Sequence, residues 1–556
     1  MLTSIEGLDL DSKGKNFWNT CRNPQEEIIY FLLIDRFSTG KEKTVIFGQD
    51  ISTGFGTAEE LKGNLGGNLK GIESKLPYLK NLGISALWLS PVFENNPESY
   101  HGYAIQNYLA VDPRFGTKDD LVSLIAEAHK LGIKVFLDII INHTGNNWSY
   151  KEDKEYTYNK GKKYAFGQWR FPDKPFPLEL RDEQLYRKQG MIRNWDIWPE
   201  TEQGDFFSLK KILLDESPEG KKAQVLLQKI YCWWIKETDC DGFRLDTVKH
   251  AGMLPVKKFC TAIKEYCLKI GKKDFFIFGE LPLDDIASSS YVTAEIWGNK
   301  KSWKVYSGPD TLLDFSLHFT LPKVIKGVLS VAKLHERFKK LDRVSTSRPE
   351  AAKSLITFLD NHDQIESSFK ARFATGAEQK QIMGGIGILF ALPGIPCLYY
   401  GTEQGFSGKG FSDALIREAM FSASESISAH NPECCIYRFV QVMAAIRTSE
   451  PALIYGTLHF NAISFSGKKY FTSSSINHLI CFSRLLFDEE ITVLYNISKN
   501  ISRKVYVRLE TYVEKNLLKV IVGNHREIKV EKIMHGEEPF AFFSIYLEPM
   551  EFVILK

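Results

Sequence analysis

Short apolar runs rich in β-branched and aromatic residues recur along the first three quarters of the chain, and most end in small or polar residues. Segments with helical spacing separate them. Strands that alternate with helices predict a parallel α/β architecture, and eight strands predict a closed (β/α)8 TIM barrel. The eight runs are 28–37, 84–93, 133–143, 242–250, 275–281, 311–319, 354–363 and 395–404.

The segment 117–132 shows the helical pattern most clearly. Thr117 or Asp119 is placed to cap its start, and Gly132 lies where a glycine commonly ends a helix. Its apolar residues recur at intervals of three and four and so share one face. They are Leu121, Leu124, Ile125 and Ala128.

The spacing between the predicted strands is uneven. Asp246 and Glu280 are 34 residues apart, about one βα unit if ~250 residues are shared among eight. Asp138 and Asp246 are 108 residues apart, which leaves about 70 residues beyond one unit. We therefore expect a small irregular domain inserted after the third strand, at 144–207, on the barrel face where enzymes build their sites.

The pattern changes near residue 452. From there to the C-terminus, short β-rich runs separated by turn signals predict an antiparallel β-sandwich. The predicted domains are a catalytic barrel at 1–143 and 208–451, the inserted domain at 144–207, and a C-terminal β domain at 452–556.

Composition narrows the functional classes. The formal charge of +3 over 556 residues implies neither a nucleic-acid nor a membrane partner. Nine cysteines form no metal-like CxxC pair, and this usage fits a reducing compartment. Without a recognisable leader or transmembrane run, we expect a soluble cytoplasmic protein. Nothing in the sequence bears on its oligomeric state.

Four of the eight predicted strands end in ionisable or amide side chains. The carboxyl ends of parallel barrel strands meet at one mouth, so these groups are expected to converge in a single cleft. Structural ion pairs alone do not readily explain so many, and clustered ionisable groups mark active sites. The residues are Asp138, Asn142, His143, Arg244, Asp246, Glu280, His362 and Asp363.

Arg244 and Asp246 share one face of their predicted strand, because side chains alternate between faces. A buried structural ion pair explains this arrangement as well as a catalytic role does. The remaining carboxylates favour the catalytic interpretation, in which Arg244 holds Asp246 charged and oriented.

The reaction class follows from what the chain contains and lacks. No phosphate-binding GxGxxG or GxxxxGK[ST] follows a strand, and there is no HExxH or GxSxG motif. Two carboxylates in one cleft suit cleavage of glycosidic bonds, with one as nucleophile and the other as general acid and then base. Glu280 follows the apolar "FFIFG", which would keep it protonated.

The motifs resemble those of the α-amylase family, glycoside hydrolase family 13. Four segments match its signature regions in order, and "SYHGYAIQNYLAVDPRFGT" (99–117) and "LPGIPCLYYGTEQG" (392–405) support them. The resemblance extends from about Ile28 to the C-terminus. The four segments are "DIIINH" (138–143), "GFRLDTVKH" (242–250), "FGE" (278–280) and "FLDNHD" (358–363).

This resemblance implies a role for each site residue. Asp246 would be the nucleophile, Glu280 the acid/base, and Asp363 the carboxylate that grips sugar hydroxyls. Asp138 would support the barrel side. The other residues implied to bind substrate are Tyr103 as a stacking platform, His101, His143, Arg244, His362, and the pair Lys249 and His250, which favours cleavage of polymers or oligomers.

The resemblance also raises the question of a calcium ion between the inserted domain and the barrel. Its ligands would be Asn142, the backbone carbonyl of His250 and, as a substitute for an aspartate that this sequence replaces by Ser208 in our alignment, Asp205. Lys210 and Lys211 lie nearby and argue against a strong cation site. Calcium binding therefore stays open, and no organic cofactor is expected.

The leading hypothesis is a retaining α-1,4-glucan hydrolase that acts on starch- or glycogen-derived glucans and maltooligosaccharides. A transglycosylase or exo-α-glucosidase with the same site residues is the alternative. A third hypothesis is a catalytically inactive binding subunit, and the intact carboxylates argue against it.

Overall fold

The structure is a computed structural model. It describes residues 2–20, 22–45, 54–283, 294–298, 301–305, 308–345, 354–365, 367–422, 424, 426–473, 478–511, 516–535 and 538–556.

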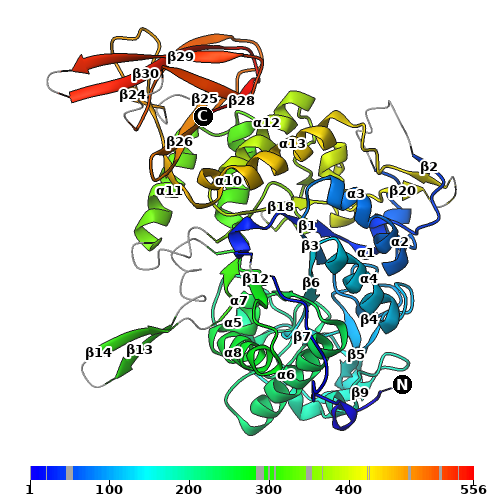
Figure 1. The fold of residues 1–556 in the computed structure, drawn as a ribbon. Coiled ribbons are helices and arrows are strands. Elements are labelled where there is room, and N and C mark those ends of the chain that lie inside the picture. Colours follow the sequence, from blue (N-terminus) through cyan, green and yellow to red (C-terminus); the bar gives the residue numbers. More distant parts are fainter. Residues whose placement is uncertain are drawn as a thin grey trace.

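Eight parallel strands form one sheet in the order β15-β12-β11-β6-β3-β1-β18-β16 (Figure 1). A parallel bridge between Leu313 and Ile356 joins its two ends, so the sheet closes into the predicted (β/α)8 barrel. Each strand lies inside one of the eight predicted runs. The strands are β1 (Ile29–Leu32), β3 (Ala86–Leu89), β6 (Lys134–Ile139), β11 (Gly242–Leu245), β12 (Phe276–Gly279), β15 (Thr311–Leu312), β16 (Ile356–Phe358) and β18 (Ile395–Tyr399).

Helices follow the strands along the chain and surround the barrel (Figure 1). They are α1 (Ile34–Phe37), α2 (Leu69–Ser74), α3 (Leu76–Asn81), α4 (Lys118–Lys130), α5 (Glu200–Gln203), α6 (Pro218–Thr238), α7 (Val248–Ala251), α8 (Met253–Ile270), α10 (Phe315–Ile325), α11 (Val331–Ser345), α12 (Gln379–Ala391), α13 (Cys435–Ser449) and α14 (Pro451–Tyr455).

The helix α4 begins and ends close to where its sequence signals lie. The Thr117 side chain accepts a hydrogen bond from the Asp120 backbone N–H, and the Asp120 carboxylate accepts one from the Thr117 backbone N–H. This reciprocal capping box satisfies two N–H groups that the first turn leaves free. Gly132 follows with φ +71°, a left-handed conformation that glycine adopts without strain.

The run 311–319 was predicted as a strand, but only its first two residues are one. Helix α10 begins at Phe315 because the Asp314 side chain caps it, accepting a hydrogen bond from Leu317 N at 2.9 Å. Apolar residues on both sides of the cap gave the run its strand-like appearance.

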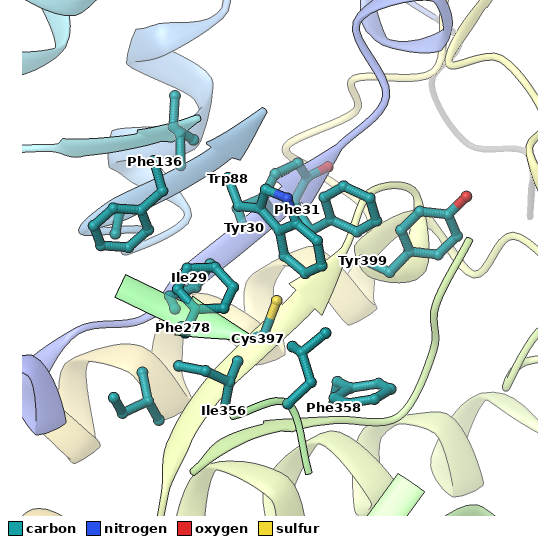
Figure 2. Packing of buried hydrophobic residues seen from close by; sticks show 14 of the residues in the cluster. Ile29, Tyr30, Phe31, Trp88, Phe136, Phe278, Ile356, Phe358, Cys397 and Tyr399 are labelled. Carbon is teal, nitrogen blue, oxygen red and sulfur yellow. The ribbon is translucent and has the colours of Figure 1, made fainter. Parts of the chain in front are cut away.

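Aromatic side chains fill part of the barrel interior (Figure 2). The ring of Phe31 stacks on Trp88 with centroids 3.8 Å apart, and Phe278 meets Trp88 edge-on at 5.4 Å. Phe136 lies two residues before Asp138 on β6, so both occupy one strand face. The aromatic layer therefore lies directly beneath the strand ends that carry the predicted site.

The inserted segment is built of short, irregular elements. Strand β7 (His143–Thr144) pairs with β10 (Lys210–Lys211) and so closes the segment at its base. The elements between them are β8 (Trp148–Tyr150), β9 (Phe166–Trp169), η4 (Lys151–Asp153), η5 (Leu178–Arg181), η6 (Glu183–Leu185) and α5.

A ten-stranded antiparallel sheet follows α14 and lies at one end of the molecule (Figure 1). The predicted antiparallel C-terminal fold is thus confirmed, as a single curled sheet. Its strands are β22 (Thr457–His459), β23 (Ala462–Ser464), β24 (Phe471–Thr472), β25 (Leu479–Leu486), β26 (Glu489–Asn496), β27 (Arg503–Arg508), β28 (Leu517–Val522), β29 (Glu527–His535), β30 (Glu538–Leu547) and β31 (Phe552–Leu555).

Smaller strands lie in the loops of the barrel, and the pair β13–β14 projects away from the rest of the protein (Figure 1). They are β2 (Thr44–Val45), β4 (Phe93–Asn95), β5 (Ile105–Val111), β13 (Ala294–Gly298), β14 (Lys301–Val305), β17 (Lys370–Ala371), β19 (Lys409–Gly410), β20 (Phe421–Ser422) and β21 (Ile427–Ser428). Over the described ranges, no helix combines the length and apolar character needed to span a bilayer.

Candidate active site

Arg244 on β11 is the centre of the candidate site. Its Nη1 donates to Asp138 Oδ1 at 2.9 Å and to Asp246 Oδ1 at 2.6 Å, and its Nη2 lies 3.1 Å from Glu280 Oε2. The guanidinium is fully buried. Three carboxyl groups from three strand ends therefore surround one buried cation, and Arg244 both makes a structural ion pair and orients the other two groups.

Asp138 is the carboxyl group of this cluster whose oxygens accept the most hydrogen bonds. Besides Arg244, its Oδ2 accepts hydrogen bonds from Trp88 Nε1 at 3.0 Å and from Tyr103 Oη at 2.8 Å. Burial raises the pKa of Asp138 to about 6, while Arg244 acts in the opposite direction. With both oxygens bonded and no exposed surface, Asp138 supports its neighbours, in line with the structural role expected for it.

Asp246 and Glu280 are buried too, but each keeps a small exposed surface, 5% and 8%, whereas Asp138 has none. Burial raises the pKa of Asp246 to about 6, and Arg244 opposes that rise. Burial also raises the pKa of Glu280, and the hydrogen bond between the two carboxyl groups lowers the pKa of Asp246 and raises that of Glu280. Each of the two carboxyl groups therefore binds a proton more readily than a solvated carboxylic acid does.

Thr247 fixes Glu280 from below and was not anticipated from the sequence. Its backbone N–H donates to Glu280 Oε2 at 3.0 Å. Thr247 has φ +48°, a left-handed conformation that is rare for a β-branched residue and stores strain. The strained turn directly after Asp246 aims this N–H at Glu280, and no side-chain pattern signals it in advance.

Asp363 and His362 lie at the end of β16, on the wall of the same cavity. Burial raises the pKa of Asp363 to about 6, with a smaller contribution from the charge of Glu280. The His362 ring donates from Nδ1 to Asn361 Oδ1 at 2.6 Å. Arg417, another residue that sequence reasoning missed, donates from Nε to the His362 carbonyl at 2.8 Å and so fixes this corner.

Three aromatic rings form a row along the cavity wall. Tyr103 lies nearly parallel to His362, with centroids 5.3 Å apart at 17°, and to His101, with centroids 5.7 Å apart at 26°. His143 Nε2 donates to the Tyr103 carbonyl at 3.2 Å. Burial lowers the pKa of His101 and of His143 to about 3, so the imidazoles offer neutral hydrogen-bonding groups rather than charges.

The cavity that these residues line measures about 560 Å³, within the range of small-molecule sites. Lys249 and His250 form part of the opposite wall, where Lys249 Nζ donates to Asp196 at 2.7 Å and His250 Nδ1 to the Thr201 carbonyl at 2.8 Å. Phe206 and Phe207 from the inserted segment also line it, and Phe207 is 62% exposed. All ten predicted catalytic and substrate-binding residues thus lie in or directly beneath one cavity.

The three residues considered for calcium also come together, but around an ammonium group. Lys211 Nζ donates to Asn142 Oδ1 and, at 2.7 Å, to the His250 carbonyl. Asp205 uses Oδ1 to accept from Lys211 N at 3.0 Å and Oδ2 to accept from Tyr150 Oη at 2.5 Å. A calcium ion needs six to eight oxygen ligands around it. Here the Lys211 ammonium occupies the position between these oxygens.

Lys211, rather than Ser208, occupies the position facing Asn142 and His250. Within the described part of the chain, no group of three or more His, Cys, Asp or Glu side chains is placed to hold a metal ion. The residues present do not fit calcium.

Comparison with known proteins agrees with this fold. The protein-family model for the α-amylase catalytic domain matches residues 31–454 of the sequence. An α-amylase of Streptomyces lividans is 32% identical over 454 residues, which cover 70% of this chain and 47% of that protein. A cyclomaltodextrin glucanotransferase of Klebsiella oxytoca is 28% identical, over 78% of this chain and 66% of its own length.

Among solved structures, an α-amylase of Anoxybacillus superimposes with a TM-score of 0.70 at 27% identity and covers 96% of this chain and 98% of its own. A barrel whose mouth carries several carboxyl groups has the side chains that a glycosidase needs. The chain belongs to the α-amylase family, whose members act on O-glycosyl bonds. It spans between about half and two thirds of the two curated relatives above.

Proposed function

We propose that this protein is a retaining glycoside hydrolase that cleaves α-1,4-glucosidic bonds in starch- or glycogen-derived glucans and maltooligosaccharides. The observation that carries the proposal is the geometry around Arg244: Asp246 Oδ1 accepts from the guanidinium at 2.6 Å, and Glu280, whose pKa is raised, lies 3.1 Å from the same guanidinium. A charged nucleophile beside a protonated acid is what double displacement requires.

In this mechanism the Asp246 carboxylate attacks the anomeric carbon while Glu280 gives its proton to the departing glycosidic oxygen. A covalent glycosyl ester on Asp246 results. Glu280, now a carboxylate, takes a proton from water, whose oxygen attacks the anomeric carbon and releases Asp246. Two inversions give net retention, and both side chains return to their starting protonation states.

The other residues hold the sugar. Asp363 makes no hydrogen bond or ion pair with any residue in the described ranges and faces the cavity, so its carboxylate is available for sugar hydroxyls. Tyr103 offers its ring for stacking, and the neutral histidines offer hydrogen-bonding groups to hydroxyls. Lys249 and His250 would contact the leaving group.

One observation favours the transglycosylase alternative. Phe207 places an exposed apolar ring on the cavity wall, and such a ring favours an acceptor sugar over water. An exo-α-glucosidase has no comparable support here. The intact acid cluster argues against an inactive binding subunit. The cytoplasmic location expected from the cysteines also remains a proposal, and the eight described cysteines are all free of disulfides.

A proton-NMR time course with maltoheptaose tests the proposal. Early α-anomeric maltose, maltotriose and longer products are expected. Chains longer than seven units would favour a transferase, and glucose released one unit at a time an exo-glucosidase. β-Anomeric products would overturn the retaining mechanism, and the absence of any reaction would overturn the substrate.

A further inference from the structure

Lys211 lies where three separate parts of the chain meet. Its strand β10 pairs with β7, with Lys211 opposite His143. The ammonium reaches Asn142 at the end of the barrel strand β6 and the carbonyl of His250 on α7. The residue is 1% exposed, so these oxygens, rather than water, satisfy its charge.

The same residue also joins the inserted segment through its backbone. Lys211 N donates to Asp205, whose other oxygen accepts from Tyr150 Oη, and that hydroxyl accepts from Gly190 N at 2.9 Å. The Asp205 carboxylate is therefore bonded on both oxygens and also stabilises the positive charge nearby. The inserted segment, β6 and α7 all converge on Lys211.

A relay of hydrogen bonds runs from the ammonium to the cavity. Because Lys211 takes Asn142 Oδ1, the Asn142 amide group is turned toward His143 and donates from Nδ2 to His143 Nδ1 at 3.1 Å. His143 must then carry its proton on Nε2, which donates to the Tyr103 carbonyl. Lys211 thus sets the tautomer and orientation of a cavity histidine without touching the cavity itself.

We propose that the Lys211 ammonium acts as a built-in cation: it ties the inserted segment to the barrel and positions His143 and His250, and the fold needs no divalent metal ion there. An ammonium group suits these oxygens because it donates only three hydrogen bonds, and Asn142 and the His250 carbonyl supply two neutral acceptors. A hard divalent cation would need several more oxygen ligands, among them charged carboxylates. This inference does not depend on the proposed reaction.

The first test uses the unmodified protein. Burial lowers the pKa of Lys211 to about 7, so thermal unfolding is measured near pH 6, where the group is largely charged, with millimolar calcium chloride or with EDTA. The two midpoints are expected to agree, and metal analysis of the protein is expected to find no stoichiometric calcium. A midpoint that calcium raises by more than about 2 °C, or one calcium bound per chain, would overturn the proposal.

Two variants test the role of the ammonium. Lys211→Met should lower the midpoint by about 4 °C or more, equally with calcium and with EDTA. Lys210→Met is the matched control, since Lys210 is the adjacent buried lysine and lies over the Trp148 ring at 4.9 Å. Its loss should leave substrate KM unchanged, whereas Lys211→Met should raise KM more than it lowers kcat. A Lys211→Met midpoint equal to the unmodified protein's would contradict the proposal.

Lys211→Asp supplies a carboxylate where the ammonium was and distinguishes a cation position from ordinary packing. Added calcium should raise its unfolding midpoint, because a metal ion then replaces the lost charge between Asn142 and His250. Failure of calcium to do so would contradict the assignment of this position to a cation. If Lys211→Met does not fold, the calcium and EDTA comparison on the unmodified protein still decides the matter.

Discussion

The proposed chemistry depends on two carboxyl groups, Asp246 and Glu280, that lie on either side of the Arg244 guanidinium. Asp246 accepts a hydrogen bond from Arg244, and Glu280 accepts one from the Thr247 N–H. Burial raises the pKa of both, so neither group behaves as a solvated acid. Activity should therefore depend on the charge of Asp246 and on the proton that Glu280 supplies.

Asp246→Asn should remove nearly all turnover, by ~10³-fold or more, because an amide cannot form the glycosyl ester. The fold should persist, since the amide still accepts from Arg244. Maltoheptaose hydrolysis and far-UV circular dichroism measure the two effects. Retention of more than a few per cent of the activity, once deamidation is excluded, would remove Asp246 from the nucleophile's role.

Glu280→Gln should separate the two halves of the reaction. The loss of acid catalysis should lower kcat on maltoheptaose by ~10²–10⁴-fold. An aryl maltoside with a nitrophenolate leaving group needs no protonation, so its first turnover should stay fast and appear as a burst. Absence of a burst, with Asp246→Asn as the control that cannot react, would argue against Glu280 as the acid.

The pH profile of kcat/KM should be bell-shaped. Asp246 must be ionised, and its pKa is raised to about 6, so activity should fall as the pH drops through about 6. Glu280 must be protonated, and its pKa is also raised, so activity should fall again at higher pH. In Glu280→Gln, measured with the aryl maltoside, the alkaline limb should disappear. An acidic limb near 4 would contradict the raised pKa of Asp246.

At the scale of elements, the barrel was predictable because each strand is a compact apolar run between polar loops. The carboxyl ends of parallel strands converge, so Asp138, Asp246, Glu280 and Asp363 could be placed in one cleft before any coordinates. The Asp314 cap that turns half of one run into α10 was not recognised. Patterns of apolar residues report burial, and capping depends on single polar atoms.

The inserted segment was predictable as an insertion but not in detail. Its short strands and turns have no period long enough to detect. The sequence alignment considered Ser208 for the cation position, whereas the side chain that contacts Asn142 and His250 is Lys211. Phe207, Thr247 and Arg417 were not among the predicted site residues. These residues owe their positions to loop conformation, which residue spacing does not encode.

Two buried arginines lie near the junction of barrel and C-terminal sheet, and neither pairs with a carboxylate among the described residues. Arg484 on β25 donates to the carbonyls of Ala391 at 2.6 Å and Gly456 at 2.8 Å, and Arg447 on α13 donates to that of Gly394 at 2.6 Å. Ala391 is the last residue of α12, where the helix dipole favours a cation.

Arg484→Met should destabilise the protein by about 2–4 kcal/mol, because it leaves buried carbonyl oxygens unsatisfied. The midpoint of thermal unfolding measures this. Arg438→Met is the matched control, since Arg438 lies exposed on α13 and pairs only with Glu433 among described residues; it should cost less than about 0.5 kcal/mol. Equal effects of the two substitutions would show that the buried carbonyls do not need the guanidinium.

At the scale of the whole molecule, the cavity is lined by the barrel strand ends, by the inserted segment and by several barrel loops, among them the one after β16. The barrel supplies the acid cluster, and in the proposed reaction the fate of the glycosyl ester depends on what the loops and the inserted segment allow to enter. Water and an acceptor sugar compete for the same position. Phe207, 62% exposed on the cavity wall, is the side chain best placed to bias that competition.

Phe207→Ala should shift product formation from transfer toward hydrolysis. An exposed aromatic ring that packs against a sugar contributes about 0.5–1.5 kcal/mol, so the ratio of transfer to hydrolysis should fall ~2–10-fold. NMR integration of chains longer than the starting maltoheptaose against new reducing ends measures the ratio. Phe411→Ala is the control, because Phe411 is 80% exposed and is not among the residues that line the cavity. If both substitutions leave the ratio unchanged, the inserted segment does not select the acceptor, and the partition is set within the barrel mouth, by Glu280 and the residues around it.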